Sequence, residues 1–410
     1  MLDINTTGQS DLRSEQSPWR RLASDLRDGP VTDDFRCDVL IIGGGITGAL
    51  MAQHLAGRGR DIVLIDRERP GLGSTAASTA MLQWEIDAPL AELADLYGFE
   101  TAADVYRRSF RAVAGLQSLV ATLGLPCSFR ESTTLYLAAG DVGGAELRNE
   151  HALRQRAGLP GHLMNHAELL AHAGFDREAA ILSPGSADAD PLCLAQGLLA
   201  RAKQGGVSVM GGDAISFDHG PRSVTVGLDA GRTIEAGHVV LATGYVMPAF
   251  IPAARHSVVS SWAISTVPQP AGCLWQDESL VWEASDSYHY MRTSADGRII
   301  IGGEDADITD ADTRDGLIPA KTAILQDRLV RLWPHADTEV SRQWAGFFGE
   351  TDDGLPLIGR VPGQPRILAA YGYGGNGITF SFMASRILSR LIDGHDQSWF
   401  QTFALDRPGA

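Results

Sequence analysis

The sequence from residue 37 to residue 48 reads Cys37-Asp-Val-Leu-Ile-Ile-Gly43-Gly44-Gly45-Ile46-Thr47-Gly48. Its first six residues form a short apolar run rich in β-branched side chains, which is typical of a strand buried on both faces of a parallel sheet. A glycine-rich turn follows at once, and residues 46–58 predict a helix rich in Ala and Leu. Residues 61–65 predict a second buried strand, which ends at Asp66. This stretch therefore predicts one complete βαβ unit of the Rossmann type.

The glycine turn has the spacing of a dinucleotide-binding turn. Gly43 would make the tight turn, Gly45 would let the backbone approach a pyrophosphate, and Gly48 would let the helix pack on the strand. The backbone N–H groups of Ile46 and Thr47 would face the phosphates at the helix N-terminus. A glycine-rich strand-to-helix turn that binds nothing is the alternative interpretation.

Asp66 stands at the end of the next strand, where a carboxylate would accept hydrogen bonds from a ribose hydroxyl. A solvated acid at a strand end is the alternative. An acidic side chain there also disfavours NADP, whose phosphate it would repel. Arg67 follows directly and is counted with Asp66 among the predicted cofactor residues.

Two further stretches have the composition of cofactor loops. Residues 71–80 are small and rich in hydroxyls, so this loop could wrap a pyrophosphate and a flavin edge without crowding the ring. Residues 371–378 would place backbone amides at the start of a helix, where partial positive charge stabilises an anion. An ordinary loop-to-helix junction and a flexible turn before a core helix are the alternatives. The predicted cofactor residues of the two stretches are Ser74, Thr75, Ala76, Ser78, Thr79, Gly374, Gly375, Asn376, Gly377 and Ile378.

The rest of the chain alternates between two kinds of pattern. Residues 89–123 predict helices, with apolar side chains every three to four positions. Patterns typical of the Rossmann part resume near Pro191, which predicts a helix start. They continue through a hairpin turn at residues 229–232. Near the C-terminal end, a strand is predicted at 367–370 and a helix at 377–392. The predicted fold class is therefore α/β, a Rossmann-type domain interleaved with an α+β substrate domain built on a mixed antiparallel sheet. The expected ranges are an extension at 1–36, the Rossmann domain at 37–88, 186–251 and 344–410, and the substrate domain at 89–185 and 252–343.

Composition narrows the class of partner. The 410 residues are 44% hydrophobic, enough for a sizeable core, and carry a net charge of -16. This charge and the absence of a dense Lys/Arg run argue against nucleic acid and a membrane surface. No apolar segment reads as a signal or a membrane span, and the four cysteines lack CxxC spacing, so neither zinc nor a disulfide framework is expected. A cytoplasmic location is expected.

Taken together, these motifs resemble those of the D-amino-acid oxidase superfamily of FAD-dependent oxidoreductases, which includes glycine, sarcosine and γ-glutamylputrescine oxidases. The further marks are Thr243 and Gly244 at the end of an apolar strand, the Trp344-Ala345-Gly346 stretch, residues 353–359 and the glycines at 374–377. The resemblance covers nearly the whole chain. It implies an FAD cofactor, hydride transfer from a substrate C–H bond to flavin N5, and no metal.

Two departures from that family narrow the expected substrate and attachment. Relatives similar to glycine oxidase carry an Arg after the Trp-Ala-Gly stretch that holds the substrate carboxylate, whereas Phe348 stands at the corresponding position here. Sarcosine-oxidase-like members attach the flavin through a Cys in this region, and Phe347-Phe348-Gly349 offers none. Non-covalent FAD and a substrate that is not a simple α-amino acid are therefore expected.

The substrate side is expected at the strand containing Tyr288, Tyr290 and Arg292, which alternate onto one face. An aromatic wall with one Arg would suit an amine bearing a distal anionic group, and a plain core face with a snorkelling Arg is the alternative. His289 would point the other way and be structural. The predicted catalytic residues are Tyr288, Tyr290, Arg292, Phe348 and Tyr373.

Glu85 and Asp87 are candidate partners for a substrate ammonium, or else solvated acids at a helix start. The expected activity is oxidation of a C–N bond of an amine or N-substituted amino acid, giving an imine that hydrolyses, with oxygen or another electron acceptor taking the electrons. Two alternatives remain: a flavin-dependent 2-hydroxy-acid or polyol-phosphate dehydrogenase, and a non-catalytic FAD-holding subunit of a hetero-oligomer.

Overall fold

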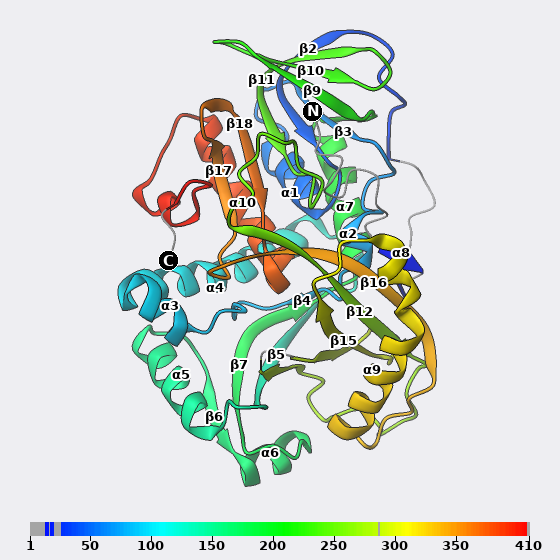
Figure 1. The fold of residues 1–410 in the computed structure, drawn as a ribbon, viewed down its shortest axis with the longest axis vertical. Coiled ribbons are helices and arrows are strands. Elements are labelled where there is room, and N and C mark those ends of the chain that lie inside the picture. The colour runs from blue at the N-terminus through cyan, green and yellow to red at the C-terminus, as the bar shows by residue number, and fades with distance from the viewer. Residues whose placement is uncertain (1–12, 16, 20–25, 286–287, 408–410) are drawn as a thin grey trace.

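Two β-sheets organise the molecule. The computed structural model describes residues 13–15, 17–19, 26–285 and 288–407. One sheet lies in the upper part of the view in Figure 1 and the other in the lower part, with the long helix α4 (Phe99–Leu123) near the level where they meet. The chain crosses between the sheets several times, because strands from both ends of the sequence enter each of them.

The upper sheet contains the predicted βαβ unit. Its strand order is β17, β18, β11, β2, β3, β8, and every neighbouring pair except β17–β18 is parallel. Strands β9 and β10 extend it by antiparallel pairing from β11. The bounds are β2 (Phe35–Ile42), β3 (Ile62–Asp66), β8 (Ser208–Gly211), β9 (Ala214–His219), β10 (Val224–Leu228), β11 (Thr233–Leu241), β17 (Leu357–Val361) and β18 (Gln364–Tyr371). The predicted Rossmann unit and the hairpin at residues 229–232 are confirmed.

Three helices of this half pack together: α1 (Ile46–Leu55) contacts both α7 (Pro191–Gln204) and α10 (Gly377–Ile392). Helix α1 ends at Leu55 rather than at residue 58, because Gly57 takes a positive φ of 73° that breaks the helix. Helix α7 begins as predicted at Pro191, and the carboxylate of Asp190 accepts hydrogen bonds from the next two free backbone N–H groups.

The lower sheet is larger and mostly antiparallel. Its order is β1, β16, β12, β15, β14, β13, β5, β7, β4, with β6 paired to β7, and only β13–β5 is parallel. The bounds are β1 (Arg13–Glu15), β4 (Met81–Leu82), β5 (Arg130–Ala138), β6 (His162–Asn165), β7 (Ala179–Asp188), β12 (His256–Thr266), β13 (Leu280–Ala284), β14 (Tyr290–Thr293), β15 (Ile299–Ala306) and β16 (Val340–Thr351). This is the mixed antiparallel sheet that the sequence predicts.

The remaining helices cover this sheet or join the two halves. Helix α9 packs on β12, β15 and β16, whereas α4 packs on α10 and so contributes to the core of the upper half. The other helices are α2 (Ser74–Ala77), α3 (Leu90–Tyr97), α5 (Gly144–Arg156), α6 (His166–Ala173), α8 (Ala311–Gly316) and α9 (Ile318–Leu332), with 3₁₀ turns η1 (Gly374–Asn376) and η2 (Ser398–Phe403). Within the described residues, no helix is long and apolar enough to cross a membrane.

Sheet membership corrects the predicted domain ranges in two places. Strand β16 pairs along its whole length with β12, so residues 344–351 belong with the lower sheet although the sequence groups them with the Rossmann part. Strand β4 pairs with β7, which moves residues 81–82 in the same way. Both segments lie where the chain passes from one sheet to the other, and their local sequence does not indicate which sheet they join.

Candidate active site

One elongated pocket runs between the two sheets. Its walls come from the β2–α1 turn, the end of β3, the loop of residues 71–83 and the end of β11 on one side, and from β12, β14, β15 and β16 on the other. The C-terminal glycine cluster before α10 closes one part of it. In open α/β sheets, ligands bind beyond the carboxyl ends of the strands, where this pocket begins.

The β2–α1 turn has the geometry of a phosphate cradle. Gly43 takes a φ of 104°, and a Cβ there would lie 2.3 Å from the carbonyl oxygen of Ala242, so only glycine fits. Gly45 is the N-cap of α1 and offers no side chain to cap it, and the first turn of α1 holds no acid. The positive end of the helix therefore faces the pocket without an anionic side chain of its own, as binding of a pyrophosphate requires.

Asp66 lines the pocket at the end of β3. Its carboxylate accepts hydrogen bonds from Gly44 N at 2.6 Å and from Glu68 N at 2.8 Å, which fixes its orientation. Burial raises the pKa of Asp66, although these two backbone donors act in the opposite direction. The residues present thus fit the adenosine and pyrophosphate of a dinucleotide.

The loop of residues 74–80 is held by three side chains distant in sequence. Trp19 Nε1 donates to Ser78 O at 2.8 Å, Trp344 Nε1 donates to Ala77 O at 2.8 Å, and Arg292 Nη1 donates to Ala80 O at 3.1 Å. Within the loop, Thr75 Oγ1 accepts a hydrogen bond from Ile46 N at 3.0 Å and so ties the loop to α1. The loop is therefore a fixed wall of the pocket.

Tyr373 joins the two glycine-rich segments through a chain of buried hydroxyls. Its hydroxyl lies 3.2 Å from Thr47 Oγ1, which in turn lies 2.8 Å from Ser381 Oγ. Ser381 Oγ donates to Gly377 O at 2.6 Å. Burial raises the pKa of Tyr373, so its phenol stays protonated at neutral pH.

The end of the pocket farther from Asp66 is aromatic and acidic. Tyr288, Tyr290 and Phe348 line it as predicted, and the two tyrosine rings lie 5.9 Å apart. Asp87 and Asp305 line the same end. Burial raises the pKa of each of these two carboxyl groups to about 6.

Most of the predicted cofactor residues come together along the pocket. Their contact with FAD stays a prediction, but the structure brings these positions from six separate segments to one surface. They are Gly43, Gly45, Ile46, Thr47, Asp66, Arg67, Ser74, Thr75, Ser78, Thr79, Thr243, Gly244, Gly346, Gly374, Gly375, Gly377 and Ile378.

Three predicted cofactor residues do not line the pocket: Gly48, Ala76 and Asn376. Gly48 packs under the turn, where a Cβ would lie 1.8 Å from the carbonyl oxygen of Gly43. Ala76 is 4% exposed within α2, and Asn376 Nδ2 donates to the carbonyl oxygen of Glu85 at 2.7 Å. These three residues lie outside the pocket lining and support the segments that form it.

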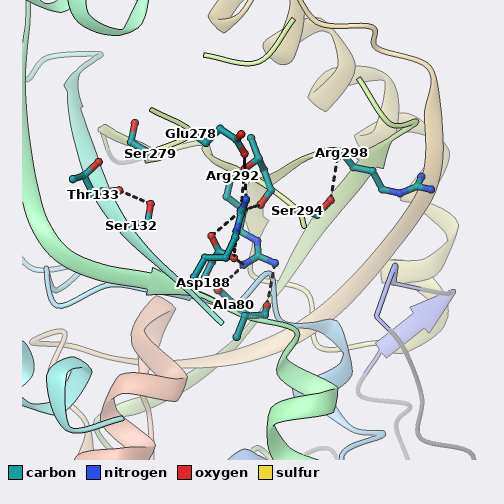
Figure 2. Close-up of polar contacts among 12 residues, drawn as sticks. Ala80, Ser132, Thr133, Asp188, Glu278, Ser279, Arg292, Ser294 and Arg298 are labelled. Atoms are coloured by element: carbon teal, nitrogen blue, oxygen red, sulfur yellow. Dashed lines mark hydrogen bonds and ion pairs between the residues drawn. The ribbon is translucent and has the colours of Figure 1, made fainter. Parts of the chain in front are cut away.

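Arg292 is the main correction on the substrate side. It is 2% exposed and does not line the pocket. Its guanidinium lies 3.1 Å from Asp188 Oδ1 and donates to the carbonyl oxygen of Ala80 (Figure 2). It also donates to the carbonyl oxygen of Ala189. Asp188 also pairs with Arg130 at 2.8 Å. Tyr288 and Tyr290 line the pocket but Arg292 does not, so the expected role of Arg292 in binding a substrate anion is wrong.

Glu85 is corrected as well. It is 1% exposed, accepts a hydrogen bond from Thr134 Oγ1, and lies 3.6 Å from Arg154 Nη1, away from the pocket lining. His289 is structural as expected, since it lies between Glu283 and Glu304 at 3.0 Å from each. Of the two candidate acids, only Asp87 lies at the pocket.

Trp344 lines the pocket and belongs to the Trp344-Ala345-Gly346 stretch that the sequence analysis names as a family feature. Ser261, Asp305 and Tyr245 also line the pocket, and the sequence analysis does not name them as site residues. For Asp305 a signal was present, because the glycine pair at 302 and 303 inside a strand pattern indicates a bulge. The others have no distinctive local pattern. In the described part of the chain, no group of three or more His, Cys, Asp or Glu side chains could hold a metal ion.

Comparison with known proteins agrees with this geometry. The family model described as DAO, FAD dependent oxidoreductase, matches residues 38–391. The chain belongs to this family and is an FAD-dependent oxidoreductase.

Individual relatives are distant. The chain is 24% identical to gamma-glutamylputrescine oxidoreductase of Escherichia coli (strain K12) over 383 residues, which cover 91% of this chain and 87% of that protein. It is 24% identical to glycine oxidase of Bacillus subtilis (strain 168) over 388 residues, covering 91% and 98%. The structure of glycine oxidase from Geobacillus kaustophilus superimposes with a TM-score of 0.75 at 20% identity, covering 92% of this chain and all of that one. These comparisons confirm the predicted fold.

Proposed function

We propose that this enzyme oxidises a C–N bond of an amine or N-substituted amino acid to an imine, which then hydrolyses. The observation that carries the proposal is Phe348, which lines the substrate end of the pocket where an arginine would be needed to hold an α-carboxylate. FAD, when bound, supplies the hydride acceptor. Its family makes the chain an FAD-dependent oxidoreductase, and the absence of an arginine at position 348 supports a substrate other than a simple α-amino acid.

The chain's own residues would hold FAD without a covalent bond. The β2–α1 turn and the uncapped start of α1 would bind the pyrophosphate, and Asp66 would bind the adenosine ribose. The fixed loop of residues 74–80 and the glycines at 374–377 would surround the flavin. No cysteine is found among the described residues that line the pocket, which supports dissociable FAD.

The residues at the other end would orient the substrate and exclude water. Tyr288, Tyr290 and Phe348 provide an apolar surface for an alkyl chain, which positions the reacting carbon. Burial raises the pKa of both tyrosines, so each phenol is a neutral hydrogen-bond donor.

The alternative hydroxy-acid or polyol-phosphate dehydrogenase needs a strong anion site. Arg292 was the candidate, and its guanidinium is instead bonded to Asp188 and to loop carbonyls. The remaining basic residue of the pocket lining, within the described ranges, is Arg67, which adjoins Asp66 at the adenosine end. The arrangement therefore favours an amine over an acid or a phosphate ester.

Anaerobic mixing of the FAD-loaded protein with a panel of amines, N-methyl amino acids and hydroxy acids tests the proposal. We expect the flavin absorbance to be bleached by nitrogen compounds alone. Reduction by hydroxy acids alone would contradict the proposal, and a yellow protein reduced by no small substrate would favour the non-catalytic subunit. Admission of oxygen followed by a peroxide assay then shows whether oxygen is the electron acceptor.

The cytoplasmic location stays a prediction.

A further inference from the structure

The substrate end of the pocket has acidic groups without basic partners in the lining. Asp87 and Asp305 both face the open space of the pocket, so each side chain has accessible surface there although the surrounding protein partly desolvates it. Asp87 lies beside the glycine cluster, where its Oδ2 accepts a hydrogen bond from Gly375 N at 2.6 Å. Repulsion from Asp87 and from the nearby Glu350 contributes to the raised pKa of Asp305. A ligand that carries positive charge would relieve this repulsion.

A β-bulge aims Asp305 into the pocket. On β12, Ser260 pairs with Ala306 and Trp262 pairs with Gly303, so Ser261 alone stands opposite the two residues Glu304 and Asp305. Glu304 takes a φ of 61°, in the left-handed region that non-glycine residues rarely adopt. Bulges of this kind re-aim a side chain next to active sites.

The strained residue is held in place from behind. Glu304 Oε1 lies 3.0 Å from His289 Nε2 and its Oε2 lies 3.2 Å from Lys321 Nζ. The carboxylate of Glu304 is therefore satisfied on the far side of the sheet, while its neighbour faces the pocket. The ion pairs of Glu304 therefore stabilise the backbone conformation that points the carboxylate of Asp305 into the pocket.

Aromatic rings complete this end. Tyr290 lies directly over Gly302, where a Cβ would meet its hydroxyl oxygen at 2.5 Å. Trp282 pairs with Tyr290 across β13 and β14, is 7% exposed, and lines the pocket, but its indole Nε1 has no hydrogen-bond partner within the described residues. Aromatic faces together with carboxylates are the groups that recognise alkylammonium ions.

We propose that this end binds a substrate with at least two amino groups and no carboxylate, and that Asp305 is the residue that selects it. This inference rests on the proposed C–N oxidation. The nitrogen beside the carbon that loses hydride must be uncharged, so it does not stay paired with a carboxylate as a cation. Two carboxylates in one pocket therefore indicate a second ammonium group, as in a short alkyl diamine or polyamine.

Three probes of equal chain length test the inference on the FAD-loaded protein: 1,4-diaminobutane, n-butylamine and 4-aminobutanoate. Anaerobic flavin reduction gives the limiting reduction rate and the Kd of each probe. We expect the diamine to bind at least about tenfold more tightly than the monoamine, because a hydrogen bond to a charged group inside a pocket is worth roughly that factor or more. The carboxylate probe should bind most weakly.

The variant Asp305→Asn keeps the shape of the side chain and removes its charge. It should raise the Kd of the diamine about tenfold, leave n-butylamine within about twofold, and change the limiting rate little. Asp307→Asn is the matched control, since Asp307 is exposed, lies just beyond β15 and does not line the pocket. Unchanged flavin absorbance and a Tm no lower than that of the natural protein would show that the variant is folded and loaded.

The outcomes separate the two proposals. If 4-aminobutanoate binds as well as the diamine, or if Asp305→Asn weakens all three probes equally, the inference about Asp305 is wrong while C–N oxidation stands. If no amine or amino acid reduces the flavin and a hydroxy acid does, the proposed function itself fails.

Discussion

Arg292 Nη1 donates a hydrogen bond to the carbonyl oxygen of Ala80, 212 residues away in sequence, at 3.1 Å. This contact fixes the last residue of the loop that walls the pocket, and Ala80 takes a positive φ of 52° there. The same guanidinium is paired with Asp188 of β7. An arginine that the sequence suggested for substrate binding therefore acts as a positioning residue for the cofactor loop.

Replacing Arg292 with methionine tests this role. The change should weaken FAD binding at least about tenfold and lower the stability by about 3 kcal/mol, because it removes one partner of a buried ion pair. Titration of the apoprotein with FAD, followed by flavin fluorescence, gives the Kd. Arg331→Met is the control, since Arg331 forms an exposed pair with Asp327 within α9 and should leave the Kd unchanged. A Kd unaffected by Arg292→Met would refute the positioning role.

Gly43→Ala should abolish FAD binding. The new methyl group would lie 2.3 Å from the carbonyl oxygen of Ala242, and the φ of 104° is unfavourable for alanine. The backbone of the turn must then move away from the phosphate position. Gly316→Ala is the matched control, because nothing lies within 4 Å of a Cβ there. Purified Gly43→Ala protein should be colourless while the control is yellow; a yellow Gly43→Ala protein would contradict the proposed cradle.

The sequence predicted the Rossmann part well because the features that define a βαβ unit lie close together in the sequence. The glycine spacing from Gly43, the buried strands and Asp66 all follow from contacts within one βαβ unit. Pro191 predicted the start of α7 for an equally local reason, its missing N–H. These are features that neighbouring residues alone determine.

The substrate end could not be predicted in the same way. Arg292 has the right alternation for a pocket residue, but its actual partners, Asp188 and Ala80, are brought there by β7 and by a loop far away in sequence. Asp305 faces the pocket because a bulge opposite Ser261 shifts the alternation, and strand periodicity assumes a regular register. Tertiary pairing, and not local pattern, decides both positions.

Diamine binding should weaken in acid. Burial raises the pKa of both Asp87 and Asp305 to about 6, so both carboxylates lose their charge as the pH falls through this value. Burial keeps Tyr288 and Tyr290 neutral over this range. The Kd of 1,4-diaminobutane should therefore rise below about pH 6, and more steeply for the wild type than for Asp305→Asn. Equal slopes for the two proteins would show that Asp305 does not bind the substrate.

The raised pKa of Asp305 also predicts an effect on the stability of the fold. A carboxyl group whose pKa is higher in the folded protein destabilises the fold when it is ionised, above pH 6, and the penalty disappears as the pH falls toward the usual value for Asp. Asp305→Asn should therefore raise the Tm of the FAD-loaded protein by about 1–2 °C near pH 7.5, and by less near pH 5. The expected change in Tm is small because the Asp305 side chain is accessible to water in the pocket. A Tm lowered at both pH values would contradict the assignment.

Phe348→Arg should move the substrate preference toward carboxylates. Phe348 lines the pocket on β16, and a guanidinium there would supply the bidentate partner that an α-carboxylate lacks in the natural pocket. It would also repel a diamine. We expect the ratio of flavin reduction by N-methylglycine to that by 1,4-diaminobutane to rise at least about tenfold. Phe348→Leu removes the ring without adding charge, so it should weaken both probes alike. If Phe348→Arg weakens both probes as the leucine variant does, the pocket does not present substrate to this position.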